Sequence, residues 1–281
     1  MGNDCNLNYF QINHLSSLHN GKSIFFCKTD FLLTDFDYIS KLNNQVVLIS
    51  GNSDYPITDK LVNLAPKNIV KWFAQNALSN NNILEPIPIG IENKIESIRE
   101  GHGICYYDRV SIKEKLLSRD INQIPTKNIY CNFNVNTNIS HRGYIKTFCE
   151  HIDYIDVDDC NLSLHNFFNT LLEYKMVLCP AGNGVDTHRL WETLYSKRVP
   201  ITVKVGNFKM YELYEKLPII ILDDISQIND LSYINECYNI QIKKGFDNYI
   251  LQTKYWVDKI NYCDYNARSN KYTVSFWKDN L

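Results

Sequence analysis

The segment 175–200 holds the residue types and spacing with the clearest chemical meaning. An apolar run at 176–179 predicts a buried strand, which Pro180 ends. The loop 181–184 (Ala-Gly-Asn-Gly) follows, and its glycines can adopt positive φ and let the backbone approach a ligand closely. A helix is predicted next. A strand, a glycine loop and a helix N-terminus in this order form an anion site, because the first N–H groups of the helix lack partners inside it.

The helix predicted at 187–196 places a cation and a carboxylate on one face. Asp186 or Thr187 is expected to cap it. Arg189 and Glu192 are three positions apart and therefore neighbours. A cation suits a diphosphate and a carboxylate suits the two hydroxyl donors of a ribose, so the pair predicts a sugar-nucleotide site. Two facts favour a blander interpretation. Such pairs also occur as plain surface ion pairs, and the loop lacks the GxGxxG and GxxxxGK[ST] spacings.

Short apolar runs alternate with helical stretches along the whole chain. In the first half, strands are expected at 23–27 and 46–50, 83–91 is extended, 111–119 is an amphipathic helix, and 67–78 fits a helix or a strand. In the second half, strands are expected at 128–133, 152–157, 176–179, 199–203 and 218–222, helices at 141–150, 163–173 and 187–196, and a helical tail from 226.

This alternation, present twice, predicts two α/β lobes with parallel sheets. The polar, proline-bearing segment 122–127 is the best linker. We therefore expect an N-terminal acceptor-binding lobe at 1–122 and a C-terminal donor lobe at 123–245. A helical tail at 246–281 is expected to pack back on the first lobe.

Several motifs resemble those of exostosin-type glycosyltransferases (glycosyltransferase family 47). That family has a strand, a P-x-G loop, D-x-x-R-x-x-E on a helix and a later proline, as in KMVLCPAGNGVDTHRLWETLYSKRVPI here. Shorter pieces look like exostosin-like enzymes of large algal viruses, in the same order over about 45–205: SGNSD, KWFAQN, IPIGIEN and YCNFNVNTNISHR. The resemblance implies a GT-B fold, which has two Rossmann-like lobes, an interlobe cleft and a C-terminal helix crossing back. It also implies a UDP-sugar donor, inversion at the anomeric carbon, no essential metal and no further cofactor.

The resemblance also implies roles for single residues. Arg189 would bind the donor phosphates and Glu192 the ribose. Four further residues would line the phosphate or the sugar: Gly182, Asn183, Gly184 and Thr187. Arg142, just after the first strand of the second lobe, is either a second phosphate-binding cation or a solvated residue at a helix start. Asn132 and Asn134 stand at the end of that strand and could contact sugar or base.

An inverting transfer needs a general base near the acceptor hydroxyl. Asp54 is the leading candidate, because it follows the 46–50 strand and loops at the carboxyl ends of parallel strands face the cleft. Its alternative role is an Asx turn in Ser53-Asp54-Tyr55-Pro56. Asp30, Asp35, His14 and Glu92 are further candidates for the base.

Two other function classes stay open. Asp156-Val157-Asp158-Asp159 and Asp35-Phe36-Asp37 match the DxD pattern of metal-dependent transferases, which bind Mn²⁺ or Mg²⁺ through such carboxylates. The two-lobe pattern favours the metal-independent interpretation. A non-catalytic glycan- or nucleotide-binding module would keep the fold without a working base.

Charge and composition exclude several classes. The 281 residues include 29 Lys plus Arg and 31 Asp plus Glu, a net charge of −2, which argues against a nucleic-acid binder that neutralises many phosphates. Nine scattered cysteines without a CxxC pair give no zinc-ribbon or thioredoxin pattern and suit a reducing compartment. No signal peptide and no membrane span are expected. Composition therefore predicts a soluble, cytoplasmic protein. The resemblance to exostosin-type enzymes implies that it is a transferase that uses a nucleotide sugar, with xylose or a similar sugar, and a glycan acceptor.

Overall fold

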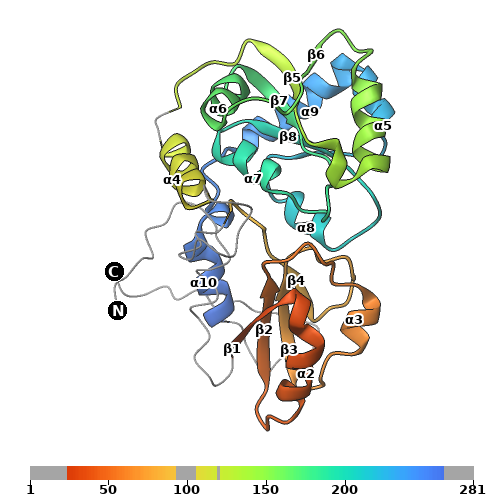
Figure 1. Cartoon of the computed structure of the whole chain (residues 1–281), viewed down its shortest axis with the longest axis vertical. Coiled ribbons are helices and arrows are strands. Elements are labelled where there is room, and N and C mark those ends of the chain that lie inside the picture. The colour runs from red at the N-terminus through yellow and green to blue at the C-terminus, as the bar shows by residue number, and fades with distance from the viewer. Residues whose placement is uncertain (1–23, 93–105, 119–120, 263–281) are drawn as a thin grey trace.

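The computed structural model describes residues 24–92, 106–118 and 121–262, which form two α/β lobes one above the other (Figure 1). Each lobe is built on its own parallel sheet, one of four strands and one of five. The expected two-lobe α/β architecture is therefore confirmed.

The N-terminal sheet has its four strands side by side in sequence order: β1 (Ile24–Lys28), β2 (Val46–Gly51), β3 (Ile69–Ala74) and β4 (Leu84–Pro86). β2 is buried along its whole length, as its continuous apolar run predicts. The segment that fits a helix or a strand by pattern is the strand β3. Pro86 ends β4, which pairs with β3 alone, a position where a missing N–H costs little.

In the C-terminal sheet the order in which the chain adds strands reverses at the first strand. Its order is β6-β5-β7-β8-β9, with β5 (Lys127–Cys131), β6 (Ile155–Val157), β7 (Tyr174–Leu178), β8 (Val199–Val203) and β9 (Ile220–Leu222). The chain runs outward from β5 to β6 and then returns to place β7 on the other side of β5. Ligands of open parallel sheets bind at such a switch point, outside the carboxyl ends of the strands.

Helices cover the sheets and connect the lobes. In the N-terminal lobe these are η1 (Thr29–Phe31), α2 (Leu32–Ser40) and α3 (Asp59–Asn63). The C-terminal lobe holds η2 (Val135–Thr137), α5 (Ile139–Cys149), α6 (Leu164–Leu171), α7 (His188–Tyr195), α8 (Met210–Tyr214), η3 (Ile225–Asn229) and α9 (Leu231–Lys244). The 3₁₀ turn η4 (Tyr249–Leu251) leads into α10 (Thr253–Asn261).

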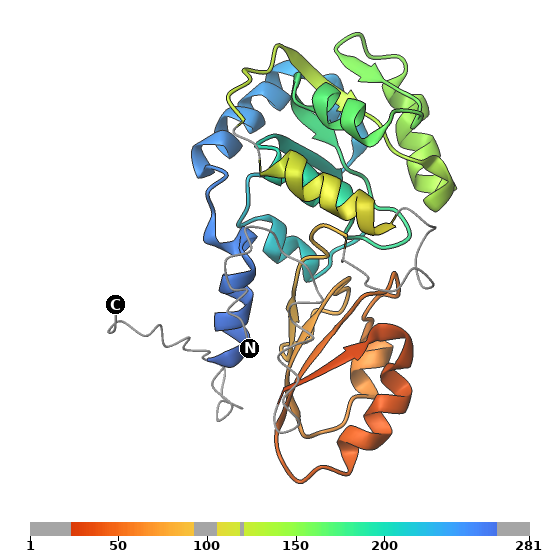
Figure 2. The ribbon, with the colours of Figure 1, turned by 60° about the vertical axis from the view of Figure 1, so that its left-hand side comes forward.

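Two helices tie the lobes together. α4 (Tyr106–Leu117) lies before the predicted boundary at 122/123 yet packs against α6 of the C-terminal lobe (Figure 2). The boundary itself stays a prediction. α10 crosses back to the N-terminal lobe, where Lys259 pairs with Glu85 of β4, so the expected crossing helix is present (Figure 1).

The expected strands lie within about three residues of those observed. Three helices, α2, α3 and α8, are absent from the sequence prediction. Two of them are only five residues long, too short to give a clear helical period. In the described ranges, no helix is long and apolar enough to span a membrane.

Candidate functional site

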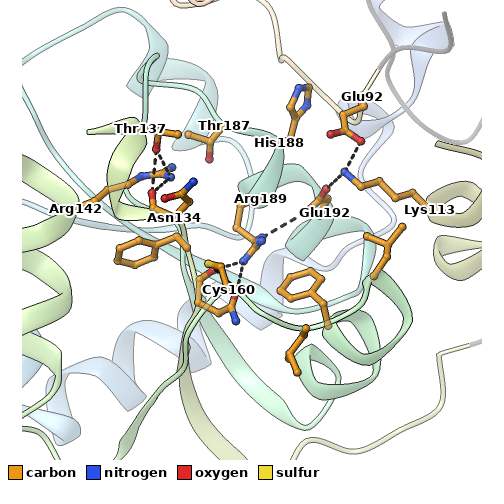
Figure 3. A pocket seen from close by; sticks show the side chains of 15 residues that line it. Glu92, Lys113, Asn134, Thr137, Arg142, Cys160, Thr187, His188, Arg189 and Glu192 are labelled. Carbon is orange, nitrogen blue, oxygen red and sulfur yellow. Dashed lines mark hydrogen bonds and ion pairs between the residues drawn. The ribbon is translucent and has the colours of Figure 1, made fainter. Parts of the chain in front are cut away.

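A pocket of about 500 Å³ lies at the switch point of the C-terminal sheet, beyond the ends of β5, β6 and β7 (Figure 3). Six of the predicted site residues line it: Asn132, Asn134, Arg142, Thr187, Arg189 and Glu192. Further lining residues include Glu92, Lys113, Thr137, Cys160, Phe167 and His188. Among the lining residues are three cations, Lys113, Arg142 and Arg189, against two glutamates, an excess of positive charge that suits an anionic ligand.

Arg142 is held on one wall of the pocket by the loops that surround it. It lies one turn into α5, whose start is capped by the Asn138 side chain. Its Nε and Nη2 donate to the carbonyls of Ala181 and Pro180, both at 3.0 Å, and its Nη1 donates to Asn134 O and Thr137 Oγ1. The residue is 7% exposed, so the alternative of a solvated helix-start arginine is wrong.

No carboxylate in the described ranges forms an ion pair with Arg142. Burial and the nearby charge of Arg189 lower the pKa of Arg142 to about 10, which leaves it a cation at neutral pH. The four acceptors bound to its guanidinium are neutral, so an anion entering the pocket meets an uncompensated positive charge.

Arg189, which is partly buried, and Glu192, which is buried, form an ion chain with the buried Lys113 rather than a plain surface pair. Arg189 Nε donates to Glu192 Oε2 at 3.3 Å, and Lys113 Nζ donates to Glu192 Oε1. Glu192 is 4% exposed. Burial alone would raise the pKa of Glu192, but the charges of Lys113 and Arg189 outweigh it and lower that pKa to about 2. Glu192 is therefore an anion at all working pH values.

Figure 3 shows Arg189 between two groups: Arg142 with Thr137 and Asn134 on one side, and Lys113 with Glu192 and Glu92 on the other. The Arg189 guanidinium lies 3.9 Å from the centre of the Phe167 ring, a cation–π contact that fixes its plane. Its Nη1 donates to the backbone carbonyl of Asn132.

Asn132 is held in one orientation by a polar chain. Its Nδ2 donates to Tyr130 OH, which donates to Asp158 Oδ2, both at 2.9 Å. Its Oδ1 accepts from Arg189 Nη1 at 3.3 Å and from Cys160 Sγ at 3.5 Å. The predicted contact residue at the end of β5 therefore also positions Arg189.

The glycine loop does not line the pocket, although it borders residues that do. A Cβ on Gly182 would lie 2.8 Å from Arg142 Nη2, and a Cβ on Gly184 would lie 2.6 Å from the Asn76 amide. Neither glycine has a positive φ; in the described ranges the glycines that do are Gly90 and Gly245. These two loop glycines thus allow the close approach of protein side chains, and neither uses the positive φ that a glycine can adopt.

Thr187, one of the two expected caps, takes the N-cap position of α7, but its side chain makes no capping hydrogen bond. The Thr187 Oγ1 atom is buried at the pocket without a hydrogen-bond partner in the described ranges. The neighbouring His188 places Nδ1 2.8 Å from the carbonyl of Gly90 in the other lobe. Burial and the charge of Lys113 lower the pKa of His188, so it is neutral at pH 7.

Asp54 lies outside the pocket lining, on the exposed surface between the lobes. Its Oδ2 accepts a hydrogen bond from Asn183 Nδ2 at 3.1 Å, which joins the two lobes. The turn at this position is made by Ser53 Oγ, which accepts from the N–H of Tyr55. The catalytic role of Asp54 stays a prediction.

The acidic residues of the second-lobe DxD pattern each have a separate partner. Asp156 accepts from Tyr174 OH, Asp158 from Tyr130 OH, and Asp159 from Lys146 Nζ. Across the described ranges, no three histidine, cysteine, aspartate or glutamate side chains gather as a metal site requires.

The sequence patterns did not predict a site role for two pocket residues. Lys113 belongs to a helix whose sequence is typical of an ordinary amphipathic helix, and the spacing of Phe167 indicates a core residue of α6. Glu92 was expected only as an alternative base and His188 as no more than a helix residue. Nothing in local spacing indicates that α4 and α7 meet.

No protein-family model matches the sequence, and no curated protein matches it, so the resemblance to exostosin-type enzymes stays a prediction. Among solved structures, the chain is similar to an α1,3-fucosyltransferase crystallised with GDP-fucose. The two are 11% identical with a TM-score of 0.34, over 83% of this chain and 81% of that chain.

Proposed function

We propose that this chain is a glycosyltransferase that moves a sugar from a nucleotide sugar to a hydroxyl group of a glycan. One observation carries the proposal. A pocket at the switch point of a parallel sheet presents Arg142 and Arg189 together with the ionised carboxylate of Glu192. The guanidinium groups suit a diphosphate, and the carboxylate suits a ribose diol.

Arg189 is the proposed phosphate ligand. Its Nη2 amino group has no partner in the described part of the chain, whereas Nε and Nη1 are held by Glu192 and Asn132. Arg142 contributes positive charge and one remaining N–H. As the donor bond breaks, negative charge grows on the leaving diphosphate, and fixed cations stabilise it most at that moment.

The apolar side of the pocket suits the nucleobase. Leu162, Leu164 and Phe167 line the pocket, and Phe167 lies against Arg189. We propose UDP as the nucleotide and xylose or a similar sugar as the transferred group, on the strength of the resemblance to exostosin-type enzymes.

The proposed reaction is a single inverting displacement without an essential metal. A carboxylate takes the proton of the acceptor hydroxyl, the acceptor oxygen bonds to the anomeric carbon, and the bond to the diphosphate oxygen breaks. Asp54 is the proposed base at the contact between the lobes. Glu92, which lines the pocket, is the alternative. The Asp54→Asn and Glu92→Gln variants distinguish them, because loss of the base lowers kcat by about 10²–10⁴-fold.

Titration calorimetry with UDP and UDP-sugars tests the donor site. Arg189→Ala and Glu192→Gln are each expected to weaken UDP binding about 10–100-fold, the cost of a lost charge-assisted hydrogen bond. Lys41→Met, at an exposed Lys–Asp pair of the N-terminal lobe, is the control. Wild-type UDP affinity in both site variants would contradict the assignment.

Transfer assays separate the remaining alternatives. A metal-independent enzyme keeps its activity in EDTA, whereas a DxD enzyme loses it. NMR of the product gives the anomeric configuration and so tests inversion. A non-catalytic binding module is favoured by one observation, the position of Asp54 outside the pocket lining. Binding of UDP-sugars without turnover across a panel of acceptors would support that module.

A further inference from the structure

Lys113 is a buried lysine between two carboxylates from different lobes. It projects from α4, and its side chain is 2% exposed. Its Nζ lies 2.8 Å from Oε2 of Glu92, which follows β4 in the N-terminal lobe, and it also donates to Oε1 of Glu192 on α7. Figure 3 shows the three side chains meeting at one end of the pocket.

The two oxygens of the Glu192 carboxylate are bound by two different cations, so Lys113 fixes the orientation of the carboxylate as well as balancing its charge. Lys113 binds Oε1, and Arg189 binds Oε2. With a cation on each oxygen, the carboxylate plane is held in one orientation at the pocket wall. Without Lys113, Glu192 would have Arg189 as its one cation and would face the like charge of Glu92, so its orientation would no longer be specified.

A purely structural explanation accounts poorly for this arrangement. Burying an ammonium group between two carboxylates is costly, and apolar side chains in place of all three groups would pack α4 against α7 without that cost. The position of the ammonium beside a ligand-sized pocket points instead to a role in ligand binding.

We propose that Lys113 is a positioning residue of the donor site. It holds the Glu192 carboxylate in the orientation that accepts the ribose hydroxyls of a nucleoside diphosphate, and it joins that carboxylate to Glu92 of the other lobe. This inference rests on the proposed function, because it takes Glu192 as the ribose ligand. Lys113 itself acts through Glu192, and the phosphates are left to Arg142 and Arg189.

A calorimetric comparison of UDP with inorganic pyrophosphate tests the role. Lys113→Met is expected to weaken UDP binding at least tenfold and to leave pyrophosphate binding within about twofold, because pyrophosphate has no ribose. Lys113→Arg, which keeps the charge, is expected to restore part of the UDP affinity. Lys41→Met is the matched control and is expected to change neither affinity.

A double-mutant cycle shows whether Lys113 acts through Glu192. The Lys113→Met/Glu192→Gln variant is expected to bind UDP no more weakly than Glu192→Gln alone. Additive losses would overturn the proposal. Equal losses of UDP and pyrophosphate binding in Lys113→Met would also overturn it, since they indicate a collapsed pocket.

Lys113→Met leaves two carboxylates side by side and can fail to fold. The variant Lys113→Met/Glu92→Gln removes one charge of each sign and avoids this, and it is compared with Glu92→Gln alone. UDP affinity at least tenfold lower in the double variant than in Glu92→Gln supports the proposal, and equal affinity overturns it. If wild-type protein binds pyrophosphate but not UDP, both this inference and the proposed function fail. If every Lys113 variant binds UDP with the wild-type affinity, only this inference fails.

Discussion

The backbone N–H of Ile89 donates a 2.6 Å hydrogen bond to Asp186 Oδ2, and this bond joins the lobes at a fully buried carboxylate. The other oxygen of Asp186 accepts from Trp191 Nε1 at 2.8 Å and Tyr214 OH at 2.7 Å, both in the C-terminal lobe. Asn76 of the N-terminal lobe accepts from the Asp186 N–H. Asp186, three residues before Arg189, therefore joins the two lobes through its hydrogen bonds.

Asp186 predicts a dependence of stability on pH. Burial raises the pKa of Asp186 from 3.8 to about 6, against the opposing effect of its hydrogen bonds. Between these pH values the folded chain holds a proton that the unfolded chain has lost. The contribution of Asp186 to the free energy of unfolding therefore falls as pH rises from about 4 to 6, by up to about 3 kcal/mol.

Urea unfolding of wild type and Asp186→Asn from pH 4 to 8 measures this contribution. Asparagine offers one acceptor oxygen, so the variant loses at least one bond and is less stable by about 1–3 kcal/mol at low pH. Because asparagine does not titrate, the difference in unfolding free energy between the two proteins should narrow as pH rises from about 4 to 6. Parallel pH profiles would contradict the prediction.

Gly182 is predicted to be intolerant of a side chain. Its Cβ would lie 2.8 Å from Arg142 Nη2, and that guanidinium is held by four hydrogen bonds and cannot move freely. Gly182→Ala should cost about 1–3 kcal/mol of unfolding free energy and weaken UDP binding by displacing Arg142.

Gly143 is the matched control, since a Cβ there meets nothing within 4 Å and the residue lies inside α5. Gly143→Ala should stabilise the chain by up to about 1 kcal/mol through helix propensity. Chemical denaturation and UDP titration of both variants check the pair. Equal stability and equal UDP affinity in the two variants would show that the Gly182 backbone can shift at no cost.

Glu85 is predicted to anchor α10 on the N-terminal lobe. It pairs with Lys259 of α10 and with Lys71 of β3, the latter at 2.9 Å. Burial would raise the pKa of Glu85, but the two lysines lower it from 4.5 to about 2. The ionised pair therefore stabilises the folded chain above pH 4.5, and this stabilisation of about 3 kcal/mol is lost as pH falls toward 2.

Acid titration of unfolding compares Glu85→Gln with Asp37→Asn, which removes the exposed Lys41–Asp37 pair. The first variant should be destabilised at pH 7 and lack the wild-type loss between pH 4.5 and 2. The second should follow wild type throughout. A wild-type acid profile in Glu85→Gln would place the anchor elsewhere on α10.

Much of the fold can be predicted from the hydrophobic pattern of neighbouring residues. The strands β2, β7 and β8 are short and mostly apolar, and their alternation with helices already predicts two parallel α/β lobes, because hydrophobic period depends on neighbouring residues alone. The proximity of Arg189 to Glu192 is equally local, since helical spacing brings them together. Short helices such as α3 and α8 were not predicted, because five residues are too few to show a helical period.

What the sequence by itself determined is therefore the set of strands, the two lobes and the cation–carboxylate pair on α7. Only the tertiary structure decided that Glu192 is buried and that Lys113, 79 positions before it, binds it. It also decided that the glycine loop holds Arg142 instead of lining the pocket. The physical reason is that these contacts join elements remote in the chain. Their meeting depends on how α4, α5 and α7 pack around the C-terminal sheet, which no local spacing records.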